Sequence, residues 1–208
     1  MAKDKSAGGN PEDYLNDLVS RFRRVLDGKK EILECFCRYG VQVEGWLKGE
    51  FLYFLDNEKK EGRIVCFDRE ISIGVGRKKV DFKARIPTSS GVLEVWIELK
   101  HWLIGAQQGT TYNAGFYFGD RNMGIKPDAE KLCHVSTGRK FFLILTTANP
   151  GVKDWLTGVA KFNRKFSPIN LESLTNPGNF PCHYYLGLLE VKKVNDFAKG
   201  VLSLPVRD

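Results

Sequence analysis

The residues whose types and spacing could carry out chemistry lie in two neighbouring segments. Asp81 lies in the first segment and Glu98 and Lys100 lie in the second, with sixteen residues between Asp81 and Glu98. Carboxylate oxygens are ligands that Mg²⁺ prefers, and Mg²⁺ keeps several waters and takes further ligands from phosphate. A bound metal lowers the pKa of a water and neutralises charge on a phosphate, and a nearby ammonium can orient that water. Two converging carboxylates and a lysine therefore favour metal-assisted phosphate chemistry.

The alternation of apolar and charged residues predicts that both segments are strands. In residues 92–100 the apolar side chains occupy the odd positions, so Glu98 and Lys100 share the other face. In residues 79–86 the apolar side chains occupy the even positions, which places Asp81 on the charged face. The turn-forming stretch between the segments predicts an antiparallel hairpin, on which the two charged faces coincide. The alternative is a solvated sheet face with ordinary cross-strand ion pairs.

The elements expected around this hairpin are helices flanking one mixed sheet, a mixed α/β (α+β) fold. We expect helices over residues 11–27, 29–39, 43–57, 126–135 and 152–162, and strands over residues 63–68 and 71–74 (one strand or two), 79–86, 92–100, 141–145 and 182–191. Residues 104–126 have no clear pattern. Residues 1–9 are expected to be a flexible tail and residues 10–208 a single domain.

A third carboxylate lies within the apolar stripe of the helix expected over residues 43–57. Glu50 follows Leu47 by three residues and precedes Phe54 by four, which are neighbouring positions on a helix. A carboxylate on an inward helix face costs free energy unless it is paired or bound to a metal. Glu50 is therefore either a third site residue or a glutamate at the edge of the stripe that reaches solvent.

In this order the residues resemble the PD-(D/E)xK, or restriction-endonuclease-like, nuclease superfamily. The family motif is an Asp followed at a distance by (Asp/Glu)-x-Lys, which Asp81 and Glu98-Leu99-Lys100 match, although Val80 stands where the proline would be. The resemblance implies an αβββαβ core over about residues 43–147, a central mixed sheet flanked by helices. N-terminal helices and a C-terminal αβ part would be additions to this core.

The resemblance also implies a role for each residue of the motif. Asp81, Glu98 and the backbone carbonyl of Leu99 would bind Mg²⁺ or Mn²⁺, Lys100 would position or activate the attacking water, and Glu50 would complete the site as a catalytic and metal-binding residue. The implied function is a Mg²⁺-dependent nuclease that hydrolyses phosphodiester bonds of DNA, as an endonuclease. The alternative is a catalytically inactive nucleic-acid-binding or adaptor domain of the same fold, and a third hypothesis is a protein-interaction module with an ordinary basic surface.

The charge of the chain favours a polyanionic partner. Lys and Arg number 32 and Asp and Glu 25, which gives a net charge of +7. The cations nearest to the motif are the expected nucleic-acid contacts: Arg77, Lys78, Lys79, Lys83 and Arg85. DNA is the expected partner, and the sequence leaves RNA open. Asp128 and Lys131 of the following helix either line the same groove or only cap and solvate that helix.

Other features bear on the compartment and on the assembly. The sequence has no long apolar run and no apolar N-terminal stretch, so no membrane partner is expected. Its five cysteines are odd in number and form no CxxC pair, which favours the cytoplasm. Cleavage of both strands of a duplex needs two cuts and one chain holds one such site, so a homodimer is expected.

Overall fold

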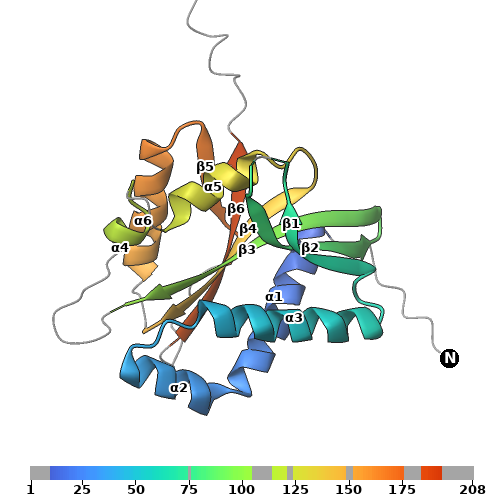
Figure 1. Cartoon of the computed structure of the whole chain (residues 1–208), viewed down its shortest axis with the longest axis horizontal. Coiled ribbons are helices and arrows are strands. Elements are labelled where there is room, and N and C mark those ends of the chain that lie inside the picture. Colours follow the sequence, from blue (N-terminus) through green and yellow to red (C-terminus); the bar gives the residue numbers. More distant parts are fainter. Residues whose placement is uncertain are drawn as a thin grey trace, which may run out of the picture.

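The computed structural model describes residues 10–74, 76–104, 114–120, 124–148, 152–175 and 184–193 (Figure 1). The helices of this part are α1 (Pro11–Asp27), α2 (Lys30–Tyr39), α3 (Glu44–Lys60), α4 (Ala114–Tyr117), α5 (Ile125–Cys133) and α6 (Val152–Lys165). The strands are β1 (Cys66–Ser72), β2 (Lys79–Thr88), β3 (Gly91–Leu103), β4 (Arg139–Thr147), β5 (Ile169–Ser173) and β6 (Tyr184–Lys193).

The strands form one six-stranded mixed sheet in the order β1-β2-β3-β4-β6-β5. Strands β3 and β4 are parallel, and every other neighbouring pair is antiparallel. A parallel pair needs a crossover connection, and the segment that contains α4 and α5 provides it. The expected mixed α/β fold is confirmed.

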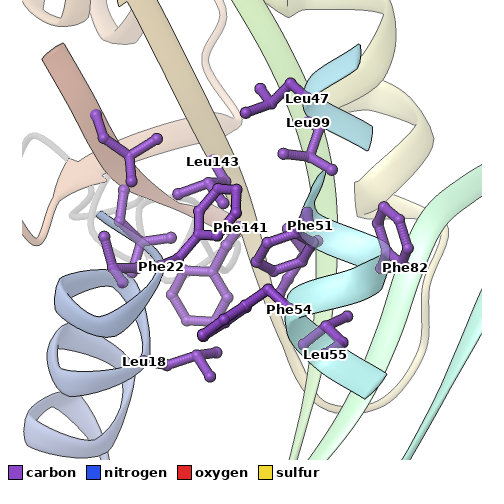
Figure 2. Close-up of a cluster of buried hydrophobic side chains, with 14 of the residues drawn as sticks. Leu18, Phe22, Leu47, Phe51, Phe54, Leu55, Phe82, Leu99, Phe141 and Leu143 are labelled. Carbon is purple, nitrogen blue, oxygen red and sulfur yellow. The ribbon is translucent and has the colours of Figure 1, made fainter. Parts of the chain in front are cut away.

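Helices cover both faces of the sheet, so the described part has three layers. On one face α1, α2 and α3 pack against odd-numbered residues of β3 and β4, as Figure 2 shows for Leu99 and Phe141. The central contact is aromatic, because the ring of Phe51 lies edge-on to Phe22 at 4.9 Å and to Phe82 at 5.3 Å. On the other face α4, α5 and α6 pack against even-numbered residues of the same two strands. Side chains that alternate along β3 therefore enter two separate cores.

A buried histidine fixes the start of α3 against β3. Nδ1 of His101 lies 3.2 Å from the backbone nitrogen of Val43 and 2.8 Å from Oε1 of Gln42, and Nε2 lies within hydrogen-bond distance of Oγ1 of Thr147, at 2.9 Å. Burial lowers the pKa of His101 to about 4, so the ring is neutral at physiological pH. His101 follows Lys100 directly, and this anchor therefore places the first turn of α3 beside the end of the motif.

The predicted helices and strands are confirmed within a few residues at each end, with two additions, the four-residue helix α4 and the strand β5. The sequence did not predict β5, a five-residue strand in which only Leu171 is buried. The predicted tail over residues 1–9 lies outside the described residues, and the single-domain organisation stays a prediction. Among the described residues, no helix is long and apolar enough to cross a membrane.

Candidate functional site

The motif residues lie where β2 and β3 part. The antiparallel ladder between these strands ends at the pair Phe82 and Ile97. Beyond that pair, the backbone N–H of Leu99 donates to Oδ2 of Asp81 at 2.9 Å. The backbone N–H of Asp81 in turn donates to Oε2 of Glu98 at 3.4 Å. Side-chain oxygens thus replace the missing backbone acceptors, and both carboxylates are almost fully buried.

The expected alternation along β2 is wrong at Val80. Val80 packs into the core on the side of α5 and α6, whereas Phe82 packs into the core on the side of α1 to α3. The strand therefore changes faces between these two residues, at the point where it leaves β3. As a result, the side chain of Asp81 does not share a face with Lys83. Its carboxylate lies between β2 and β3 instead.

From α5, two side chains reach the strands. The ammonium of Lys131 lies 2.6 Å from Oε1 of Glu98 and 2.8 Å from Oδ1 of Asp128. The other oxygen of Asp128, Oδ2, lies 2.8 Å from the ammonium of Lys100. Asp128 and Lys131 are three residues apart, so they share one helix face. Of the two alternatives for these residues, the structure favours the one in which they line the site.

Helix α3 lies on the opposite face of the sheet from α5, and its residues Glu44 and Lys48 contact the same motif residues. The ammonium of Lys48 lies 2.8 Å from Oδ1 of Asp81 and 3.1 Å from Glu44. Glu44 also lies 3.9 Å from the ammonium of Lys100. We call the resulting group the acid–lysine cluster, and its members are Glu44, Lys48, Asp81, Glu98, Lys100, Asp128 and Lys131.

The structure does not bring Glu50 to this cluster. Its carboxylate lies 2.7 Å from the ammonium of Lys29, at the other edge of the buried face of α3. Glu44 lies near the motif, where Glu50 was expected. The two residues are six positions apart, which is about 120° around a helix, so they lie at opposite edges of the buried face of α3. An apolar stripe has two edges, and the sequence pattern does not say which edge meets the motif. The Glu44 and Lys48 pair, four residues apart, was the available signal for the other edge.

Burial and neighbouring charge set the protonation of the cluster. Burial, followed by the charges of Asp81 and Asp128, raises the pKa of Glu98 to about 7, although Lys131 opposes the shift. Burial alone would lower the pKa of Lys100, but the charges of Asp128 and Glu44 outweigh it and the pKa rises. Lys100 is therefore a fixed ammonium at neutral pH, which suits it to donate hydrogen bonds rather than to accept a proton.

The oxygen atoms of the cluster fit a hard divalent cation. In an extended strand next to an antiparallel neighbour, the N–H and the C=O of a given residue point to the same side. The N–H of Leu99 points to Asp81, so the carbonyl of Leu99 points to that side too. Asp81, Glu98 and this carbonyl then offer three oxygens of the type that Mg²⁺ takes. In the described part of the chain, no three His, Cys, Asp or Glu side chains form a ready-made metal group. Mg²⁺ needs only one or two carboxylates, because waters and substrate phosphates supply its other ligands.

A cavity of about 310 Å³ opens beside Asp81, between α3 and the β1–β2 hairpin. It is lined by Gly45, Lys48, Gly49, Leu52, Arg69, Glu70, Asp81 and Phe82. A Cβ atom built on Gly45 or Gly49 would meet no atom within 4 Å, so the two glycines leave this space open. In the lining the cations Lys48 and Arg69 balance the acids Glu70 and Asp81, so the cavity has no net charge, and it gives access to Asp81 from this side.

The five cations expected to contact nucleic acid differ in their exposure and in their ion pairs. Arg77, Lys78 and Lys79 are exposed where β1 connects to β2, and Arg85 is exposed on β2. Lys83 is held more firmly, since its ammonium lies 2.8 Å from Glu94 and 4.7 Å from the centre of the Trp96 ring. The structure thus leaves four of these five cations accessible, and their contact with nucleic acid stays a prediction.

No family model matches the sequence, and a search of curated proteins found no match.

The raised pKa of Glu98 predicts a pH-dependent effect of the variant Glu98→Gln. The unfolded chain releases this proton at about pH 4.5 and the folded chain at about pH 7, so Glu98 destabilises the folded protein as the pH rises between these values. Relative to wild type, Glu98→Gln should gain about 1–3 kcal/mol of unfolding free energy from pH 5 to pH 8. Urea unfolding with EDTA present measures this difference, and parallel pH profiles for the two proteins would contradict it.

Proposed function

We propose that the chain is a Mg²⁺- or Mn²⁺-dependent nuclease that hydrolyses phosphodiester bonds of DNA, as an endonuclease, at the acid–lysine cluster. The observation that carries the proposal is that the carboxylates of Asp81 and Glu98 meet where β2 and β3 part, with Lys100 on the same strand as Glu98. The succession α3-β1-β2-β3-α5-β4, with the short α4 before α5, supports it because it follows the order of the αβββαβ core.

Asp81, Glu98 and the carbonyl of Leu99 would hold the metal. When bound, the metal lowers the pKa of a water and neutralises charge that develops on the phosphate. Lys100 supplies a protonated donor at the same place, and Asp128 fixes its ammonium at 2.8 Å. A fixed ammonium orients a water or stabilises a phosphate oxygen without first having to reorganise.

The other two lysines let the carboxylates remain buried before a cation arrives. A buried carboxylate without a partner costs several kcal/mol. Lys48 pairs with Asp81 and Lys131 pairs with Glu98, yet each lysine also has a second acid, Glu44 for Lys48 and Asp128 for Lys131. Each ammonium therefore keeps a partner when its first carboxylate turns to another cation.

One specific observation favours a second candidate, an inactive nucleic-acid-binding or adaptor domain. Lys48 and Lys131 already neutralise the two carboxylates that would bind a metal. In such a domain, the cluster would only join α3 and α5 to the sheet. The two candidates differ in one measurable property, because only the first requires a divalent cation for its action on DNA.

The variant Lys100→Ala should separate catalysis from binding. Wild-type protein is expected to cut plasmid, linear duplex or branched DNA when Mg²⁺ or Mn²⁺ is present. Loss of one fixed donor lowers such rates by about 10²–10³-fold, so Lys100→Ala should lose cleavage and keep DNA affinity. Gel-based cleavage and fluorescence anisotropy measure the two quantities, and Lys60→Ala at the exposed end of α3 is the charge-matched control. Wild-type protein that cuts none of these DNAs, or Lys100→Ala that cuts at the wild-type rate, would contradict the assignment.

The two glutamates of α3 form a matched pair for testing the site. Glu44→Gln removes an acid that contacts both Lys48 and Lys100, and should lower the cleavage rate at least about tenfold. Glu50→Gln removes only the partner of Lys29, and should leave the rate unchanged while costing about 1 kcal/mol or less of stability. Single-turnover rates and urea unfolding test both variants. The reverse order of rates would restore Glu50 to the site.

The cavity beside Asp81 predicts opposite effects on stability and activity. Gly49→Ala should raise the unfolding free energy by about 0.5–1 kcal/mol, because alanine favours the helix and its Cβ meets no atom within 4 Å. Gly49→Leu should stay folded but fill the cavity, and cleavage should fall. Cleavage by Gly49→Leu at the wild-type rate would show that the substrate does not enter here.

A further inference from the structure

A second cavity, of about 450 Å³, lies between α4 and α6, apart from the acid–lysine cluster. It is lined by Gly115, Phe118, Gly119, Asp120, Lys161, Arg164 and Lys165. The last two turns of α6 supply its three cations, and Gly115 and Gly119 line it in the region of α4. A space of this size is within the range of small-ligand sites.

The cations of this cavity are largely unbalanced. Lys165 forms an ion pair with Asp120 at 2.6 Å, and both side chains remain half exposed. Lys161 and Arg164 are exposed and have no acidic partner among the residues that the structure describes. Three cations and one acid give a net charge of +2 at the lining.

A fourth cation connects this cavity to the first turn of α5. The ammonium of Lys126 lies 5.0 Å from the centre of the Phe166 ring, directly after the end of α6. Contact with Lys165, and to a smaller degree the charge of Lys126, lowers the pKa of Asp120. Lys126 lies in α5, the helix that also carries Asp128 and Lys131 of the acid–lysine cluster.

Strand β3 also connects the cavity to the acid–lysine cluster. Phe118 packs edge-on against Trp102 of β3 at 5.9 Å. Trp102 follows Lys100 by two residues and lies on the same strand face, which is about 7 Å along a strand. Figure 1 shows α4 and α6 towards one end of β3 and the β1–β2 hairpin towards the other.

We propose that this cavity binds a backbone phosphate of the nucleic-acid strand that crosses the acid–lysine cluster. The inference rests on the proposed function and extends it by naming where the strand leaves the site. Lys161 and Arg164 provide the free charge for the phosphate. Phe118 is only 1% exposed, so its ring offers no face for a base. The contact is therefore made by charge and does not depend on the base sequence.

The test compares two variants that each remove two charges. Lys161→Ala with Arg164→Ala changes the cavity, and Lys59→Ala with Lys60→Ala changes exposed cations at the end of α3. Anisotropy of a labelled DNA duplex, in EDTA so that no cleavage occurs, gives affinity as a function of salt concentration. The cavity variant should bind on the order of tenfold more weakly at low salt, and its salt slope should fall by about 1. The α3 variant should bind as wild type does.

The outcomes separate this inference from the nuclease proposal. Weaker binding by the cavity variant alone supports the inference, even if wild-type protein cuts no DNA and the nuclease proposal fails. Equal affinity for both variants overturns the inference, even if wild-type protein cuts DNA. Wild-type protein that binds no DNA also overturns it. Stronger competition by polyglutamate than by an unlabelled duplex would show that the cavity takes an acidic protein segment and would overturn it too.

Discussion

Two carboxylates buried at the parting of β2 and β3 impose the main constraint on this structure. Asp81 is 6% exposed and Glu98 is 2% exposed, and a buried acid needs a counter-charge or hydrogen bonds to remain in the folded protein. The backbone N–H of Leu99 meets part of this need for Asp81. The rest comes from lysines on two different helices, so both helix layers must be positioned against the same point of the sheet.

Separate devices hold the two helices in place. The hydrogen bonds of His101 to Val43 and Thr147 fix the first turn of α3, which carries Glu44 and Lys48. On the other face, α5 reaches Glu98 and Lys100 through a pair of side chains three residues apart. The same contacts that keep the acids buried also gather hard oxygen ligands and a fixed ammonium. Stability and the proposed chemistry therefore depend on one set of ion pairs.

The sequence predicted the layers and the motif better than it predicted the shell around the motif. Alternation with period 2 placed β2 and β3, and the helical stripe placed α3, because each pattern reports which face of an element is buried. Two features were beyond such patterns. The face change at Val80 depends on where β2 leaves its partner strand, and the choice of Glu44 over Glu50 depends on which edge of α3 meets β3. Both are set by tertiary packing, and the only local signal for either is the four-residue spacing of Glu44 and Lys48.

The most direct measurement of the central claim is a calorimetric titration of the metal-free protein with Mg²⁺ and Mn²⁺, beside the variant Asp81→Asn. Asparagine keeps the size of the side chain and removes the charge that would attract the cation. The account predicts saturable uptake of the cation by wild-type protein and its loss in Asp81→Asn. Wild-type protein that takes up neither cation, or uptake that is the same in both proteins, would contradict a metal site at the parting of β2 and β3.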